Sequence, residues 1–175
     1  MEPERCSECG FDGTRLSVQD AIAALRTLGP RWREAFEDVP DEILRRRPSQ
    51  AVWSPLEYAA HTRDVLAMNG WGMAEILEGG HPEFPVIEPD PVTEQGAADH
   101  GYNALEPELV LDELEANARR IADRASRVVG RDPWTRTARV GSQDMEAGWV
   151  LRHALHDATH HLRDVERILN GGSEA

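Results

Sequence analysis

The sequence predicts an all-α protein built as a four-helix bundle. Four long segments carry apolar residues at spacings of three and four, which place one apolar stripe along each helix. Helix start signals precede these segments, and no segment shows the alternation of a convincing strand. With 175 residues, of which 40% are hydrophobic, the chain is long enough for one such core. We expect one bundle domain over residues 15–172, preceded by an N-terminal arm over residues 1–14.

The first helix is expected to begin after Ser17, which forms an N-cap together with Asp20. Its apolar pattern runs through residues 18–39. Pro30 should kink or interrupt this helix, because proline lacks an N–H group and collides with the preceding turn. Residues 40–50 read as a connector that contains one short helical turn.

The second helix has the clearest start signal in the chain. Ser54, Pro55 and Glu57 supply an N-cap, a proline at the first helical position and the third-position glutamate of a capping box. This helix should run from Pro55 to about Leu77. Four prolines then fall within residues 81–106, which predicts a long crossover or lid with a helical turn near residues 97–105.

The third and fourth helices follow from the same apolar periodicity. Pro107 opens the third helix, and Gly130 is expected to end it. Residues 131–144 should form an irregular connection. The fourth helix is expected over residues 146–169, before an Asn-Gly-Gly stop.

The charge of the chain narrows the range of partners. Acidic residues outnumber basic ones by 32 to 19, which gives a net charge of -13. Such a surface repels phosphate backbones and anionic lipids, so we expect neither nucleic acid nor a membrane as partner, but a small-molecule substrate. Because no stretch approaches the ~20 apolar residues of a membrane span and no secretory leader is visible, the sequence predicts a cytoplasmic protein.

Histidines in the fourth helix carry the strongest chemical signal. His156 and His160 are four residues apart, so both imidazoles can reach one ion from adjacent turns. His61, in the second helix, is the candidate third ligand. Three imidazoles suit zinc, with Ni²⁺, Co²⁺, Cu²⁺ and Fe²⁺ as alternatives, and leave one coordination position open.

Several neighbours of these histidines have weaker assignments. His153 could replace His156, whereas His161 points away and is expected at the surface or behind a ligand. Asp64, Asp157 and Asp164 lie on the same helices and are candidates to orient ligating rings. Helical histidines are also commonly exposed to solvent, so spacing alone does not establish a metal site.

Cys6 and Cys9 form a CxxCG motif in the arm. This is the form of a zinc knuckle, but a closed site needs two more ligands, and His81 or His100 could supply them from the crossover. Alternatives are an arm with two reduced thiols that bind nothing, or a redox dithiol.

The segments WSPLEYAAH, residues 53–61, and HDATHHL, residues 156–162, together resemble the DinB/YfiT-like family. The resemblance spans residues 17–169. It implies an up-up-down-down bundle with a long crossover between the second and third helices. It also implies a metal held by one histidine of the second helix and an HxxxH or ExxxH pair of a later one, which carries over to His61, His156 and His160.

The resemblance further implies a metal-dependent enzyme that uses a low-molecular-weight thiol, such as mycothiol or bacillithiol, in S-transfer or isomerisation, and a homodimer. The metal would hold the sulfur as a thiolate and present it to an electrophile. No residue stands out as the general base. The alternatives are a non-catalytic metal-binding or stress-response protein, a metal-hydroxide hydrolase that uses no thiol, and an acidic interaction module.

Overall fold

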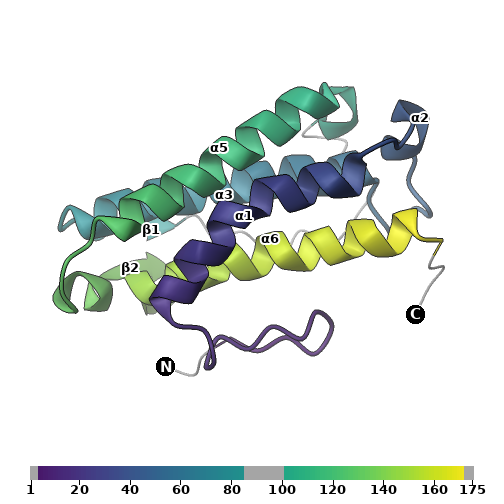
Figure 1. Ribbon diagram of the computed structural model, residues 1–175. Coiled ribbons are helices and arrows are strands. Elements are labelled where there is room, and N and C mark those ends of the chain that lie inside the picture. The colour runs from purple at the N-terminus through teal and green to yellow at the C-terminus, as the bar shows by residue number, and fades with distance from the viewer. Residues whose placement is uncertain (1–3, 85–100, 172–175) are drawn as a thin grey trace.

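A computed structural model describes residues 4–84 and 101–171, which form an elongated helical bundle (Figure 1). The four long helices are α1 (Val18–Phe36), α3 (Pro55–Leu77), α5 (Pro107–Ser126) and α6 (Ala147–Leu169). Short helical turns are α2 (Asp41–Leu44), η1 (Tyr102–Ala104) and η2 (Asp132–Thr135). The strands are β1 (Glu83–Phe84), β2 (Thr137–Val140) and β3 (Gln143–Glu146). The predicted all-α four-helix bundle is confirmed.

Each long helix packs against two others. α1 and α3 lie at opposite corners, and each contacts both α5 and α6. Ion pairs give the directions of the helices. Arg63 pairs with Glu113 and Arg124 with Glu78, so α3 and α5 run parallel.

The other two helices run the opposite way. α1 is antiparallel to α5, because residues 33 and 26 of α1 pair with residues 108 and 123 of α5. α6 is antiparallel to α3, because His161 in its second half contacts Tyr58 near the start of α3. In chain order the helices therefore run up, down, down, up, and not up-up-down-down as the resemblance implied. The short α2 connector makes α1 and α3 antiparallel, whereas the predicted long crossover joins the parallel pair α3 and α5.

Capping decides where α1 and α3 begin. The Ser17 hydroxyl accepts a hydrogen bond from the backbone N–H of Asp20, and Ser54 and Glu57 form the predicted capping box of α3. Pro30 does not interrupt α1, which continues to Phe36. Its last two turns are held by buried Trp32 and Phe36, which outweigh the hydrogen bond that a proline removes.

Two expectations about the later connections were wrong. α5 ends at Ser126 and not near Gly130, because the next two N–H groups bond to carbonyls three residues back instead of four. Residues 131–144 are not irregular: β2 pairs antiparallel with β3 and parallel with β1. These strands have two to four residues, too few for an alternating pattern to be recognised. A helical turn was also predicted near residues 97–105. The structure has η1 in this range, and residues 97–100 lie outside the described residues.

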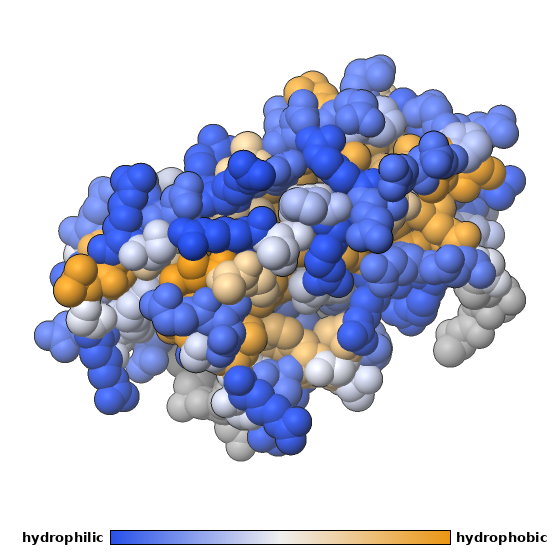
Figure 2. Space-filling view, viewed as in Figure 1, coloured by the Kyte–Doolittle hydropathy of each residue, from blue (hydrophilic) through white to orange (hydrophobic). Residues whose placement is uncertain are grey.

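The core lies where the four helices meet. Buried residues from all four contribute, and the largest side chains with the least exposure are Trp32, Leu25, Leu28, Leu56, Leu66, Met73, Ile76, Leu114, Ile121, Leu151, Leu162 and Val110. Hydrophilic side chains cover most of the face shown in Figure 2, and hydrophobic residues show mainly between them. Among the described residues, none of the helices combines the length and apolar character needed to cross a membrane.

One buried ion pair fixes the start of α3. Glu57 is 2% exposed, and its two carboxylate oxygens each accept a hydrogen bond of 2.7 Å from Arg47. Glu57→Ala should cost about 3 kcal/mol, because it removes the carboxylate that pairs with the guanidinium of Arg47, whose side chain is only 16% exposed. We expect the melting temperature to fall by about 6–12 °C. Glu78→Ala removes an exposed partner of Arg124 and should change it little; equal shifts in the two variants would contradict this assignment.

Candidate metal centres

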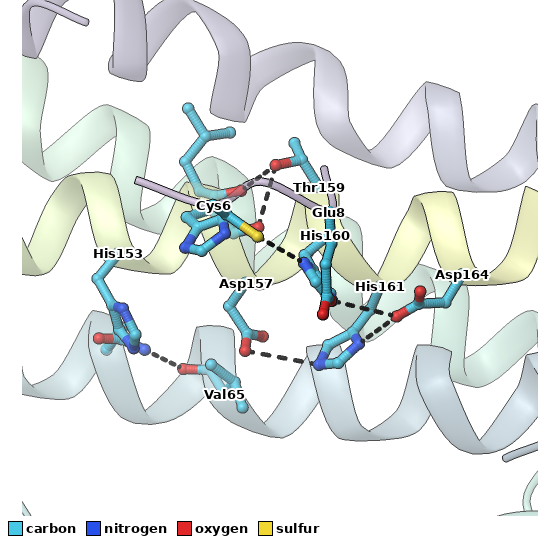
Figure 3. Close-up of polar contacts among 12 residues, drawn as sticks. Cys6, Glu8, Val65, His153, Asp157, Thr159, His160, His161 and Asp164 are labelled. Atoms are coloured by element: carbon cyan, nitrogen blue, oxygen red, sulfur yellow. Dashed lines mark hydrogen bonds and ion pairs between the residues drawn. The ribbon is translucent and has the colours of Figure 1, made fainter. Parts of the chain in front are cut away.

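Two pairs of possible metal ligands lie along α6, and each residue of the second pair directly follows a residue of the first in the sequence. His156 and His160 form one pair, and Asp157 and His161 form the other. Because successive helical residues are about 100° apart around the axis, the pairs face different sides of the helix. Figure 3 shows Asp157 and His161 on the side toward α3, whereas Cys6 of the arm lies beside His160.

The first group, here called the bundle cluster, consists of His61, Asp157 and His161. One ligand atom from each lies within 4.8 Å of the others. The imidazoles of His61 and His161 are nearly perpendicular, with centroids 5.1 Å apart. His161 Nε2 is 3.6 Å from Asp157 Oδ1. Nitrogen and oxygen ligands bound tetrahedrally to one zinc ion would be about 3.4 Å apart, so this spacing is close to that of a formed site.

Hydrogen bonding in the bundle cluster also suits a metal ion. Asp157 Oδ2 is buried and makes no hydrogen bond within residues 4–84 and 101–171. His161 Nδ1 lies 3.1 Å from Asp164 Oδ2, which leaves Nε2 directed toward Asp157. A carboxylate on the second ring nitrogen is the usual support of a metal-binding histidine. The donor set, two imidazoles and one carboxylate, is typical of catalytic zinc sites.

Aromatic side chains line the bundle cluster. Trp53 packs on His61 and Tyr58 on His161, with ring centroids 5.2 and 5.3 Å apart. Burial, with a contribution from the charge of Asp164, raises the pKa of Tyr58 to about 12, so its hydroxyl is neutral at physiological pH. The side chains of Asp157 and His161 are each 19% exposed, so the cluster lies at the edge of the core.

The second group lies where the arm meets α6. Residues 4–13 form a hairpin in which the Cys6 N–H donates to the Phe11 carbonyl and the Gly13 N–H to the Glu4 carbonyl, each at 2.9 Å. Figure 1 shows this hairpin alongside α6. The Phe11 ring stacks on His156 with centroids 4.5 Å apart. The hairpin therefore docks on the His156 side of the helix.

Docking brings both cysteines to two histidines of α6. One ligand atom from each of Cys6, Cys9, His156 and His160, here called the arm cluster, lies within 4.8 Å of the others. The backbone N–H of Cys9 donates to the Cys6 sulfur and, against burial, lowers the pKa of that thiol to about 6, with help from His156. Burial raises the pKa of Cys9. The thiol of Cys6 therefore loses its proton at a lower pH than the thiol of Cys9.

Glu4 supports the arm cluster from behind. Its Oε1 lies 2.8 Å from His156 Nδ1 and 3.2 Å from His153 Nδ1. Burial acts to raise the pKa of Glu4, but hydrogen bonds with His153 and His156 outweigh it and lower the pKa to about 2. His156 responds in the opposite sense: burial acts to lower its pKa, and Glu4 and Cys6 raise it overall. The carboxylate thus stays charged and holds the His156 ring.

The structure divides the histidines that spacing had put together. His61 joins Asp157 and His161, whereas His156 and His160 join the cysteines. The reason is visible in the pattern of α6. His156 and His160 lie opposite the buried stripe that includes Leu155 and Leu162, so they face away from α3. The residues that follow them, Asp157 and His161, lie at the edge of that stripe.

The remaining candidates are placed as follows. Asp164 supports His161, as expected of an orienting residue, whereas Asp64 accepts a hydrogen bond from the Tyr102 hydroxyl. His81 lies beside Asp144 and the Thr137 carbonyl, apart from the arm. His100 is outside the described residues. The missed ligand candidates, Asp157 and His161, carry the same spacing of four as the pair that was chosen.

Comparisons with known proteins agree with this fold. The sequence profile of the DinB superfamily matches residues 15–165. Among solved structures, YfiT from Bacillus subtilis, described as a probable metal-dependent hydrolase with an unusual four-helix bundle topology, has a TM-score of 0.76 and 13% identity. The match covers 97% of this chain and 93% of that one, and at this identity it shows the fold. No curated protein matches the sequence.

Proposed function

Because the chain belongs to the DinB superfamily, we propose that it is a metal-dependent enzyme whose ion is held by His61, Asp157 and His161. One observation carries the proposal: three side chains from two helices each bring a donor atom within 4.8 Å of the others, and the carboxylate of Asp157 has a buried oxygen, Oδ2, without a hydrogen bond among the described residues. An unsatisfied buried carboxylate oxygen is costly unless a ligand meets it. Zinc suits this donor set best.

The charge of the bundle cluster favours an anionic nucleophile. Two neutral imidazoles and one carboxylate leave a divalent ion with one net positive charge, which one thiolate or hydroxide would balance. When bound, such an ion lowers the pKa of a thiol or a water molecule so that it is a nucleophile at neutral pH. With three protein ligands, the coordination sphere has room for that fourth group.

The residues around the ion have separate tasks. Asp164 holds the His161 ring through Nδ1, so that Nε2 keeps its direction. Trp53 and Tyr58 pack on the rings of His61 and His161 and help to hold them in place. Because its hydroxyl is neutral at physiological pH, Tyr58 is a hydrogen-bond donor for a substrate oxygen.

We propose a low-molecular-weight thiol such as mycothiol as the nucleophile and a small electrophile as its target, which makes the enzyme an S-transferase or isomerase. The family resemblance of residues 53–61 and 156–162 supports this choice. The second candidate is a hydrolase, in which water takes the place of the thiol. It is favoured by the His₂Asp donor set, which resembles that of hydrolytic zinc enzymes, and by the description of YfiT.

A paired activity assay distinguishes the two. Zinc-loaded protein is given a chlorodinitrobenzene with and without mycothiol, and separately a nitrophenyl ester without thiol. Thiol-dependent arylation that is lost in His61→Ala and kept in His81→Ala supports the transferase. Ester hydrolysis with the same dependence on His61 supports the hydrolase. If zinc-loaded protein accelerates neither reaction beyond free zinc, the enzymatic proposal fails and a non-catalytic metal site is the better account.

A further inference from the structure

The arm is too small to hold its position through a core of its own. Ten residues in a hairpin are marginal in water, and only Cys9 and Gly13 among residues 4–13 are buried. Yet its contacts run along one line of α6, from His153 and His156 to His160. The spacing of those contacts matches one face of a helix. The contacts between the hairpin and α6 must therefore supply the stability that the hairpin lacks.

The turn of the hairpin has the shape of a metal knuckle. Backbone N–H groups of Glu8 and Cys9 point at the Cys6 sulfur. Gly10 follows with φ of +71°, a conformation that glycine adopts without strain. The N–H of Phe11 in turn points at the Cys9 sulfur. Both sulfurs therefore accept backbone N–H groups, an arrangement that stabilises thiolates and suits a cation between them.

Two histidines bring the number of candidate ligands to four. Cys6 Sγ and His160 Nδ1 are 3.6 Å apart. A sulfur and a nitrogen bound to one zinc ion at about 2.3 and 2.05 Å, at the tetrahedral angle, are also about 3.6 Å apart. A hydrogen bond between a thiol and a neutral imidazole has a similar length, so this distance alone does not identify a metal site. The evidence from Cys9 and His156 is therefore needed as well.

The orientation of His156 is the independent observation. Its Nδ1 lies 2.8 Å from Glu4, whereas its Nε2 is buried and has no hydrogen bond within the described residues. His160 has a similar arrangement, since its Nε2 lies 3.6 Å from the carboxylates of Glu8 and Asp164. Each histidine thus directs one nitrogen at a carboxylate and the other at the cysteines, as metal-ligating histidines do.

We propose that Cys6, Cys9, His156 and His160 bind a second zinc ion, which fastens the N-terminal arm to α6. Four protein ligands close the coordination sphere, so the site is structural and not catalytic. Two thiolates and two imidazoles select zinc over hard cations such as Mg²⁺ and Ca²⁺. The site shares no ligand with the bundle cluster, although Asp164 lies beside one histidine of each. It does not depend on the proposed enzymatic function.

Metal content measured on tag-free, full-length protein tests this directly. After loading with zinc and gel filtration, the wild-type chain should hold about two zinc ions, and Cys6→Ser/Cys9→Ser and His61→Ala about one each. Circular dichroism confirms that each variant is folded. His81→Ala, at an exposed histidine outside both clusters, should keep both ions. A cysteine variant that retains two ions would overturn the proposal.

Cobalt substitution supplies a second readout, which distinguishes the two clusters by their ligands. Cobalt in the arm cluster should give thiolate-to-metal charge-transfer absorption in the near ultraviolet, which His61→Ala keeps and Cys6→Ser/Cys9→Ser loses. The absence of this absorption in reduced wild-type protein would refute the site, as would a Cys6–Cys9 disulfide that persists under reducing conditions. If the bundle cluster fails to bind zinc but the charge-transfer band remains, the enzymatic proposal fails and the arm site stands.

Discussion

His161→Ala should lower turnover by at least about 100-fold, because removing even a residue that only supports a ligand costs 10–100-fold. With His161 absent, Asp157 and His61 are two donors on different helices, which hold a divalent ion weakly. The variant should also lose one zinc ion but keep the thiolate-to-cobalt absorption of the arm cluster. The fold should survive, since the side chain is at the edge of the core and 19% exposed.

Two control variants make this result specific. His81→Ala removes an exposed histidine and should leave activity unchanged. His160→Ala should leave the bundle ion in place, because His160 belongs to the arm cluster. If His160→Ala abolished activity and His161→Ala did not, the ligands would be His61, His156 and His160, as the spacing alone first suggested.

Trp32→Ala should cost about 3–5 kcal/mol of unfolding free energy, because it leaves a large cavity where α1 meets the core. Trp32 is fully buried and packs beside Phe36, with ring centroids 6.1 Å apart. For a chain of this size the melting temperature should fall by about 6–20 °C. Thermal unfolding followed by circular dichroism measures the change.

Trp71 provides the matched control for Trp32. Trp71 lies on α3 but is 49% exposed, and its ring packs on that of Phe84 in β1. Trp71→Ala should therefore cost about 1 kcal/mol or less. Similar losses in the two tryptophan variants would mean that the core does not lie where the four helices meet.

The sequence predicts the helices well where local chemistry decides their ends. Ser54, Pro55 and Glu57 define the start of α3, and the predicted end at Leu77 is confirmed. The sheet escaped prediction because its pairing is non-local: the paired residues of β1 and β2, such as Glu83 and Arg139, are 56 positions apart, and each strand is too short to show a pattern. Helix directions were wrong because they came from resemblance and not from any pattern in the chain.

The candidate site shows a different limit. Histidine content identified α6 as the helix that carries candidate ligands, but a step of one residue turns a side chain by about 100°. The apolar stripe of α6 contained the missing information: His156 and His160 lie opposite it, so they could not face a histidine of α3. The partners of Cys6 and Cys9 could not be predicted from local sequence patterns, because Cys6 and His160 are 154 positions apart.

The central claim is that His61, Asp157 and His161 hold a metal ion between α3 and α6. Crystals grown with zinc, with anomalous diffraction measured on both sides of the zinc absorption edge, test it most directly. The account predicts an anomalous peak within about 2.0–2.2 Å of one atom from each of these three side chains. A peak bound instead by His61, His156 and His160, or the lack of any peak beside His61 at full zinc loading, would contradict it.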